Sequence, residues 1–165
     1  MSDLTIQNPA FKSFAIATGV LGLKMVATNL SVVTLRVISN NFGYAEDRVL
    51  FPTVLNAITG GNYSKWTKKE EKPNKQPSEL IPRLNAASNN DAGSIPIFLL
   101  LSLTWIIVAK PSEETATKVL GAFVGARFVH VFAFVTRIQP FRVASYLTGL
   151  GATGYVVAGI LKAVL

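Results

Sequence analysis

The chain has 165 residues, of which 50% are hydrophobic and only 15% charged, with a mean hydropathy of +0.39. Soluble domains are usually nearer a quarter charged, so this composition favours an integral membrane protein. The sequence has no cysteine and one histidine, which excludes disulfides, a thiolate metal site and a multi-histidine metal site. The net charge of +7 comes from basic residues beside apolar segments, the usual pattern of membrane topology, so we expect no nucleic-acid binding.

Long apolar stretches predict an all-α fold, an integral membrane four-helix bundle formed by a single domain over residues 1–165. The predicted spans are about 11–37, 82–108, 115–137 and 141–161. Each is long enough to cross a bilayer, which takes about 20 residues. Lys24 lies in the middle of the first span, and we expect it to reach the membrane surface or to pair with another helix.

A long polar loop, about 38–81, separates the first two spans and carries a charge block at 65–72. This composition predicts a segment outside the membrane. Within the loop, Arg48 to Ile58 is apolar enough to lie on the bilayer surface or against the bundle. Four spans place both termini on one side, and the positive-inside rule predicts that the other, more basic side is cytosolic or matrix-like.

The second span begins with polar residues at helical spacing, namely Arg83, Asn90, Asp91 and Ser94. They form either an exposed first turn or two, or one wall of a polar site. In the third span, Arg127 and His130 are three residues apart and share a helical face, so we expect them to point at a partner, a cavity or a ligand.

Gly121 and Gly125, four residues apart in the same span, predict close approach by another helix.

Arginines mark the ends of the predicted helices on the basic side: Arg36, Arg83, Arg137 and Arg142. Tyr146 lies one turn after Arg142. Arginines in a low-dielectric pocket bind carboxylates and lower the pKa of a nearby thiol, which would suit a small polyanionic thiol. Helix-end arginines also commonly meet lipid phosphates, and the residues alone leave both interpretations open.

The segment Val124-Gly125-Ala126-Arg127-Phe128-Val129-His130 resembles the VGAR-x-x-H signature of the MAPEG family, membrane-associated proteins of eicosanoid and glutathione metabolism. It is most similar to the branch of microsomal glutathione transferases and prostaglandin E synthases. Three further stretches resemble family motifs in the same order: Arg36 with Phe42, Glu46 and Asp47 (Ala45 replaces the usual proline); Arg83 with Ala87, Asn90 and Asp91; and Pro140 with Arg142 and Tyr146.

The resemblance implies a four-helix protomer, usually a homotrimer, with glutathione bound between subunits near the cytosolic face. Arg142 would stabilise the thiolate and Tyr146 would contact glutathione. The remaining positions would line or support the pocket: Arg36, Arg83, Asn90, Arg127 and His130. A lipophilic electrophile or peroxide would arrive from the bilayer. The family's usual membrane is the endoplasmic reticulum, and a mitochondrial membrane is the second expectation.

Several pocket positions depart from the family pattern. Ser88 replaces a histidine, Ala86 an arginine, and Gly93 the glutamate that helps to hold the glutathione ammonium group. Phe134 stands where some members have tyrosine, and Val143 where the prostaglandin synthase has serine. The arginines and Tyr146 indicate a glutathione transferase or peroxidase. The departures favour the alternative, a non-catalytic scaffold, lipid-binding protein or accessory subunit of a larger membrane complex.

Overall fold

The computed structural model describes residues 4–39, 41, 47–63, 65 and 79–165. Within these ranges the helices are α1 (Pro9–Ile38), α2 (Asp47–Ile58), α4 (Leu80–Ala109), α5 (Glu113–Thr136) and α6 (Gln139–Val164). Phe42, Ala45, Glu46 and residues 66–72 of the charge block lie outside the described residues, as does the side chain of Asp47. The four long helices are apolar and long enough to cross a membrane, which confirms the all-α membrane bundle.

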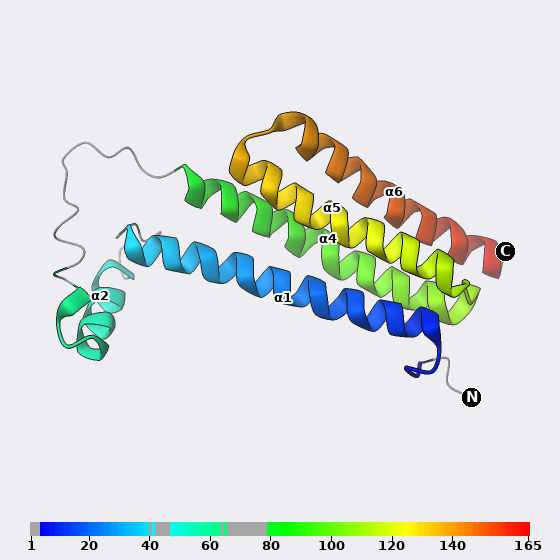
Figure 1. Cartoon of the computed structure of the whole chain (residues 1–165), viewed down its shortest axis with the longest axis horizontal. Helices are drawn as coiled ribbons and strands as arrows, with labels where there is room; N and C mark the ends of the chain where they lie inside the picture. Colours follow the sequence, from blue (N-terminus) through cyan, green and yellow to red (C-terminus); the bar gives the residue numbers. More distant parts are fainter. Residues whose placement is uncertain (1–3, 40, 42–46, 64, 66–78) are drawn as a thin grey trace.

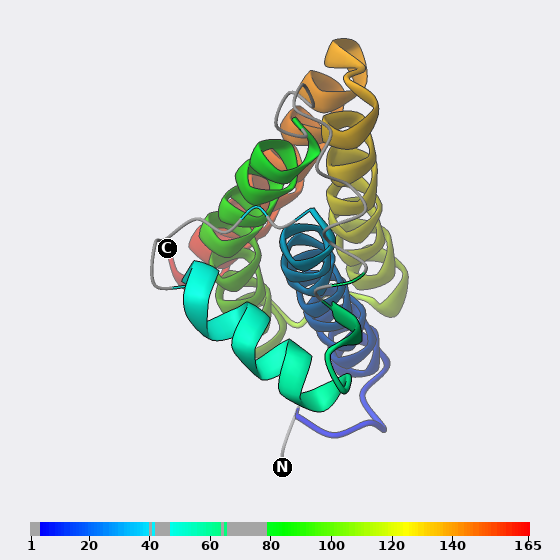
Figure 2. The same cartoon turned by 90° about the vertical axis from the view of Figure 1, so that its left-hand side faces the viewer.

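The long helices lie side by side along one axis, and both termini lie at the same end of the bundle (Figure 1). The short α4–α5 turn is at that end too. The end of α1, the start of α4 and the α5–α6 turn lie together at the opposite end. α2, which covers the apolar stretch expected at Arg48 to Ile58, lies across this second end (Figure 2).

Local sequence signals explain where the helices begin. The Asn8 side chain accepts hydrogen bonds from the backbone N–H groups of Ala10 (3.0 Å) and Phe11 (3.4 Å), with Pro9 in the first turn of α1. Ser112 caps α5 in the same way through the N–H of Thr115 at 3.3 Å. Acidic residues in the first turn of α5 stabilise this helix, because they interact with the positive N-terminal end of its dipole.

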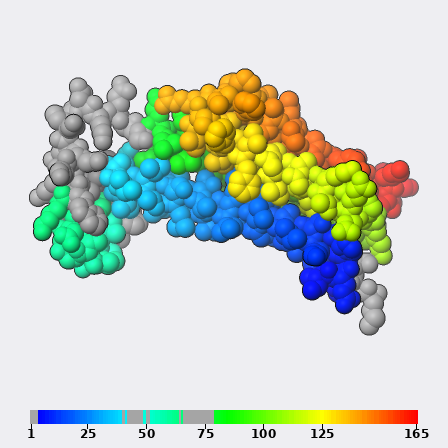
Figure 3. All heavy atoms as spheres, in the orientation of Figure 1, coloured from blue at the N-terminus to red at the C-terminus, as the bar shows by residue number. Residues whose placement is uncertain are grey.

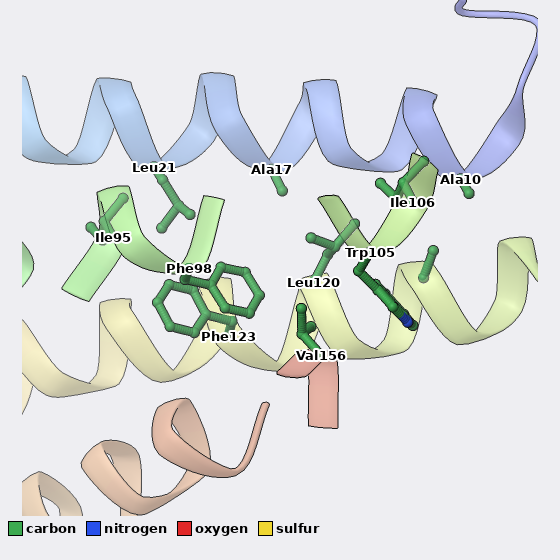
Figure 4. Close-up of a cluster of buried hydrophobic side chains, with 11 residues drawn as sticks. Ala10, Ala17, Leu21, Ile95, Phe98, Trp105, Ile106, Leu120, Phe123 and Val156 are labelled. Atoms are coloured by element: carbon green, nitrogen blue, oxygen red, sulfur yellow. The ribbon is translucent and has the colours of Figure 1, made fainter. Parts of the chain in front are cut away.

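An apolar cluster fills the half of the bundle nearest the termini, between α1, α4, α5 and α6 (Figure 4). The Phe98 and Phe123 rings stack at its centre with centroids 3.6 Å apart. A smaller cluster of Val32, Ile81 and Leu84 lies toward the other end. Between the two clusters the bundle interior is polar, and this layer contains most of the predicted site residues.

The outward faces of the four long helices are also apolar. Leu23, Leu100 and Phe132 are 72%, 68% and 60% exposed, and they lie on three different helices. The space-filling view shows the outward surface that α1, α5 and α6 form on one side of the bundle (Figure 3). Side chains of this kind favour contact with lipid, as expected of membrane-spanning helices.

The expected close approach at Gly121 and Gly125 is wrong within the protomer, because a Cβ atom at either position would meet nothing within 4 Å. The close contacts are on α6 instead. A Cβ atom at Gly159 would lie 2.9 Å from Cδ1 of Trp105, and one at Gly149 would overlap the Arg127 guanidinium. The sequence marked many small residues but did not indicate which of them face a neighbouring helix.

Candidate functional site

A buried ion pair joins α1 to α4 in the polar layer. The Lys24 ammonium donates to the Asp91 carboxylate, and the two residues are only 6% and 1% exposed. Lys24 is therefore paired with another helix, one of its two expected arrangements. The Ser88 hydroxyl donates to Asn29 Oδ1 at 2.6 Å, and this second contact also joins the two helices.

The side chain of Arg127, which belongs to α5, is buried where α5 meets α4 and α6. Its Nη1 donates to Asn90 Oδ1 at 2.8 Å and to Ser94 Oγ at 3.0 Å. Its guanidinium carbon lies 4.8 Å from the centroid of the Phe123 ring, and the side chain occupies the space that a Cβ at Gly149 would need. Among the described residues Arg127 forms no ion pair at salt-bridge distance, although the buried Asp91 carboxylate attracts its charge electrostatically.

His130 lies one turn after Arg127 and is only 3% exposed. Its Nδ1 lies 3.1 Å from Ser145 Oγ, and that hydroxyl donates to the carbonyl oxygen of Arg142 at 3.0 Å. A hydroxyl proton directed at the carbonyl favours the tautomer in which Nδ1 carries the imidazole proton and donates to Ser145. This leaves Nε2 as an acceptor without a hydrogen-bond partner among the described residues.

His130 also borders a cavity of about 200 Å³ that opens on the surface of the protomer; we call it the inner cavity. Its lining residues come from α4, α5 and α6: Asn90, His130, Phe134, Arg142, Val143 and Tyr146. The half-buried Arg142 guanidinium lies 5.0 Å from the Phe134 ring centroid, which fixes it by a cation–π contact. Tyr146 is 47% exposed, at the open side.

Three predicted site residues do not line this cavity, although one of them, Arg127, contacts its wall through Asn90. Arg83 borders an adjoining cavity on the same side of α4, and Arg36 lies in the last turn of α1 and lines neither space. The structure thus brings together Asn90, Arg127, His130, Arg142 and Tyr146, while Arg83 is nearby and Arg36 is separate. The polar stripe of α4 also divides, because Asp91 faces α1 whereas Asn90 and Ser94 face Arg127.

The structure also shows where the residues that depart from the family pattern lie. A Cβ atom at the exposed Gly93 would meet nothing, so a long side chain there would extend away from the protomer. Asp91 cannot replace the missing glutamate, because Lys24 holds its carboxylate on the opposite side. Sequence reasoning missed Ser145 and the role of Phe134. Ser145 follows Arg142 by three residues and Phe134 follows His130 by four, so helical spacing was the available signal.

Comparison with known proteins gives a family match and several relatives. Residues 14–162 match the MAPEG family. The microsomal glutathione S-transferase 1 of Homo sapiens is 28% identical over 168 residues, covering 100% of this chain and 99% of the relative. The protein of the same name from Sus scrofa is 28% identical over 165 residues, covering 98% and 97%. The protein from Mus musculus is 27% identical over 156 residues, covering 93% and 91%.

Proposed function

The chain belongs to the MAPEG family, and from this premise we propose that it is a membrane-bound, glutathione-dependent transferase or peroxidase acting on lipophilic electrophiles. The observation that carries the proposal is the inner cavity, where a cationic guanidinium, an imidazole ring and a phenol border one space. This set of groups suits an anionic thiol, because charge-assisted hydrogen bonds to arginine are strong where water is scarce.

Arg142 supplies the positive charge beside which the glutathione thiol loses its proton, since a guanidinium lowers the pKa of a neighbouring thiol. The thiol proton passes to water at the open side of the cavity, because Nε2 of His130 is enclosed by the bundle and does not reach the cavity surface. The thiolate sulfur then bonds to an electrophilic carbon and the leaving group departs with its electron pair. Arg127 does not touch the ligand itself. Its hydrogen bond orients the Asn90 amide at the cavity wall.

The inner cavity opens sideways, with Tyr146 at its exposed margin. We therefore propose a homotrimer in which a neighbouring protomer covers the opening, and the endoplasmic reticulum as the membrane. Lipophilic substrates would enter between apolar outer faces that also contact membrane lipids. A larger membrane complex or a mitochondrial membrane is the alternative.

The first test is glutathione binding and turnover of an aryl halide by protein in lipid nanodiscs. We expect saturable binding by calorimetry, and Arg142→Ala should lower turnover roughly 10- to 100-fold, as expected for loss of a charged hydrogen bond. Lys118→Ala is the matched control, because Lys118 is an exposed cation paired with Glu114 at the other end of α5. Lys24 is unsuitable as a control because its ion pair is buried.

The second candidate is a non-catalytic membrane scaffold or lipid-binding subunit. It is favoured by the pairing of Asp91 with Lys24 and by Gly93, which together leave no carboxylate at the inner cavity among the described residues. An unpaired ammonium in a partly buried site is costly. Absence of binding at millimolar glutathione would support this candidate and would refute the enzyme.

A further inference from the structure

A second cavity, of about 290 Å³, adjoins the inner cavity toward the end of the bundle; we call it the outer cavity. It is lined by Glu79, Pro82, Arg83, Ala86 and Phe134. Residues 79, 83, 86 and 90 follow helical spacing, so one face of α4 passes from the outer cavity to Asn90 in the inner one. Phe134 lines both cavities, so the two adjoin at this ring.

The dimensions fit a ligand that occupies both cavities. Arg83 and Asn90 are seven residues apart on α4, which corresponds to about 10 Å along the helix axis. In glutathione the thiol is on the middle residue, and the eight bonds from its sulfur to the γ-glutamyl nitrogen span roughly the same distance when extended. A thiol placed beside Arg142 in the inner cavity would thus leave the far end of a tripeptide in the outer cavity.

The two cavities differ in charge. Among the described lining residues of the inner cavity the charged side chain is a cation, Arg142. The outer cavity has both signs, because Glu79 Oε2 accepts a hydrogen bond from Arg83 Nη2 at 3.4 Å and forms an ion pair with Arg137 Nη2 at 2.6 Å. Both contacts use the same oxygen, and a carboxylate has about four acceptor sites, so Glu79 retains capacity for a further donor.

We propose that the outer cavity is the subsite for the zwitterionic amino-acid end of the thiol ligand. Arg83 binds its carboxylate and Glu79 binds its ammonium, while Arg137 holds Glu79 in place from the α5–α6 turn. This assignment rests on the proposed glutathione dependence. Glu79 thus supplies a counter-charge for the ammonium group about four turns of α4 before Gly93, the position at which the family's glutamate is absent.

The test compares glutathione with N-acetylglutathione, which lacks the ammonium charge, by calorimetry on protein in nanodiscs. We expect the wild type to prefer glutathione by about tenfold, the order expected for one charged contact. Glu79→Gln should lower this preference to less than about threefold by weakening glutathione binding alone, and Glu79→Asp should keep most of it. Arg83→Gln should weaken both ligands, since both retain the carboxylate.

Glu114→Gln is the matched control, because Glu114 forms the same i,i+4 pair with a cation on the exposed surface of α5. Glu79 is itself 58% exposed, so its substitution should leave the fold intact. An unchanged preference in Glu79→Gln would overturn the subsite and leave the proposed function standing. Failure of the wild type to bind either thiol would overturn both.

Discussion

At the middle of α1, a lysine meets a carboxylate that is 67 residues further along the chain. Taking two charges out of water costs several kcal/mol for each ion, and close pairing offsets this cost only while both partners are present. Asp91 Oδ1 has no hydrogen-bond partner among the described residues, so the pair is the main compensation for this buried charge. We therefore expect Lys24 and Asp91 to matter chiefly for stability.

Replacing Asp91 with asparagine would leave the Lys24 ammonium buried without a counter-charge. We expect a loss of about 3–5 kcal/mol in the free energy of unfolding, measured by denaturant titration in detergent micelles. The double variant Lys24→Met/Asp91→Asn should recover most of this loss. A double variant no more stable than Asp91→Asn would show that the ion pair is not what stabilises the contact.

Residue spacing predicted part of the site. The three-residue interval placed Arg127 and His130 on one helical face, and both are buried in the polar layer. Asn90 and Asp91 are neighbours in sequence, yet successive helical residues point about 100° apart, so they face different helices. Spacing pointed to Ser145, three residues after Arg142, but it cannot reveal which second helix faces a residue. It therefore did not indicate the contact of Ser145 with His130 or that of Glu79 with Arg137.

Among the helices, α6 makes the closest contacts and does so through glycine. Arg127 fits against Gly149, and Trp105 of α4 fits against Gly159. The apolar stretches predicted four long helices because length and composition suffice for that. They did not predict the inward faces, since helices in a membrane are apolar on the lipid side as well. The wrong expectation at Gly121 and Gly125 has this cause.

Gly149→Ala should disturb the site through helix packing alone. The added Cβ would overlap the Arg127 guanidinium, which is buried and cannot move without losing its bonds to Asn90 and Ser94. We expect a loss of about 1–3 kcal/mol in stability, measured by denaturant titration, and weaker glutathione binding. Gly151→Ala is the control, because a Cβ there meets nothing within 4 Å. Equal effects of the two substitutions would contradict the packing argument.

At the scale of the whole molecule, both cavities open on the side of the protomer and much of the outer surface is apolar. The antiparallel arrangement of the four long helices was predictable because the turns after the second and third spans are short. The oligomeric assembly was not predictable from the sequence. The sequence of one chain does not distinguish a helix face that meets lipid from a face that meets another protomer. The homotrimer therefore stays a proposal.

Size-exclusion chromatography with light scattering in mild detergent would test the proposed homotrimer. We expect a protein mass three times that of the 17.8 kDa protomer, because a neighbour is needed to cover the opening beside Tyr146. Chemical crosslinking should give the same number of subunits. A clean monomer that still binds glutathione would show that one protomer holds the complete site.

The buried pair between α1 and α4 has a consequence for biosynthesis. Ribosomes add about 5–20 residues per second, so Asp91 is made roughly 3–13 seconds after Lys24. During that interval α1 would carry a lone ammonium at mid-membrane, at a cost of about 2.5–3.5 kcal/mol. The order of synthesis therefore favours an α1 that waits beside the insertion channel until α4 arrives, so that the two helices enter the lipid together.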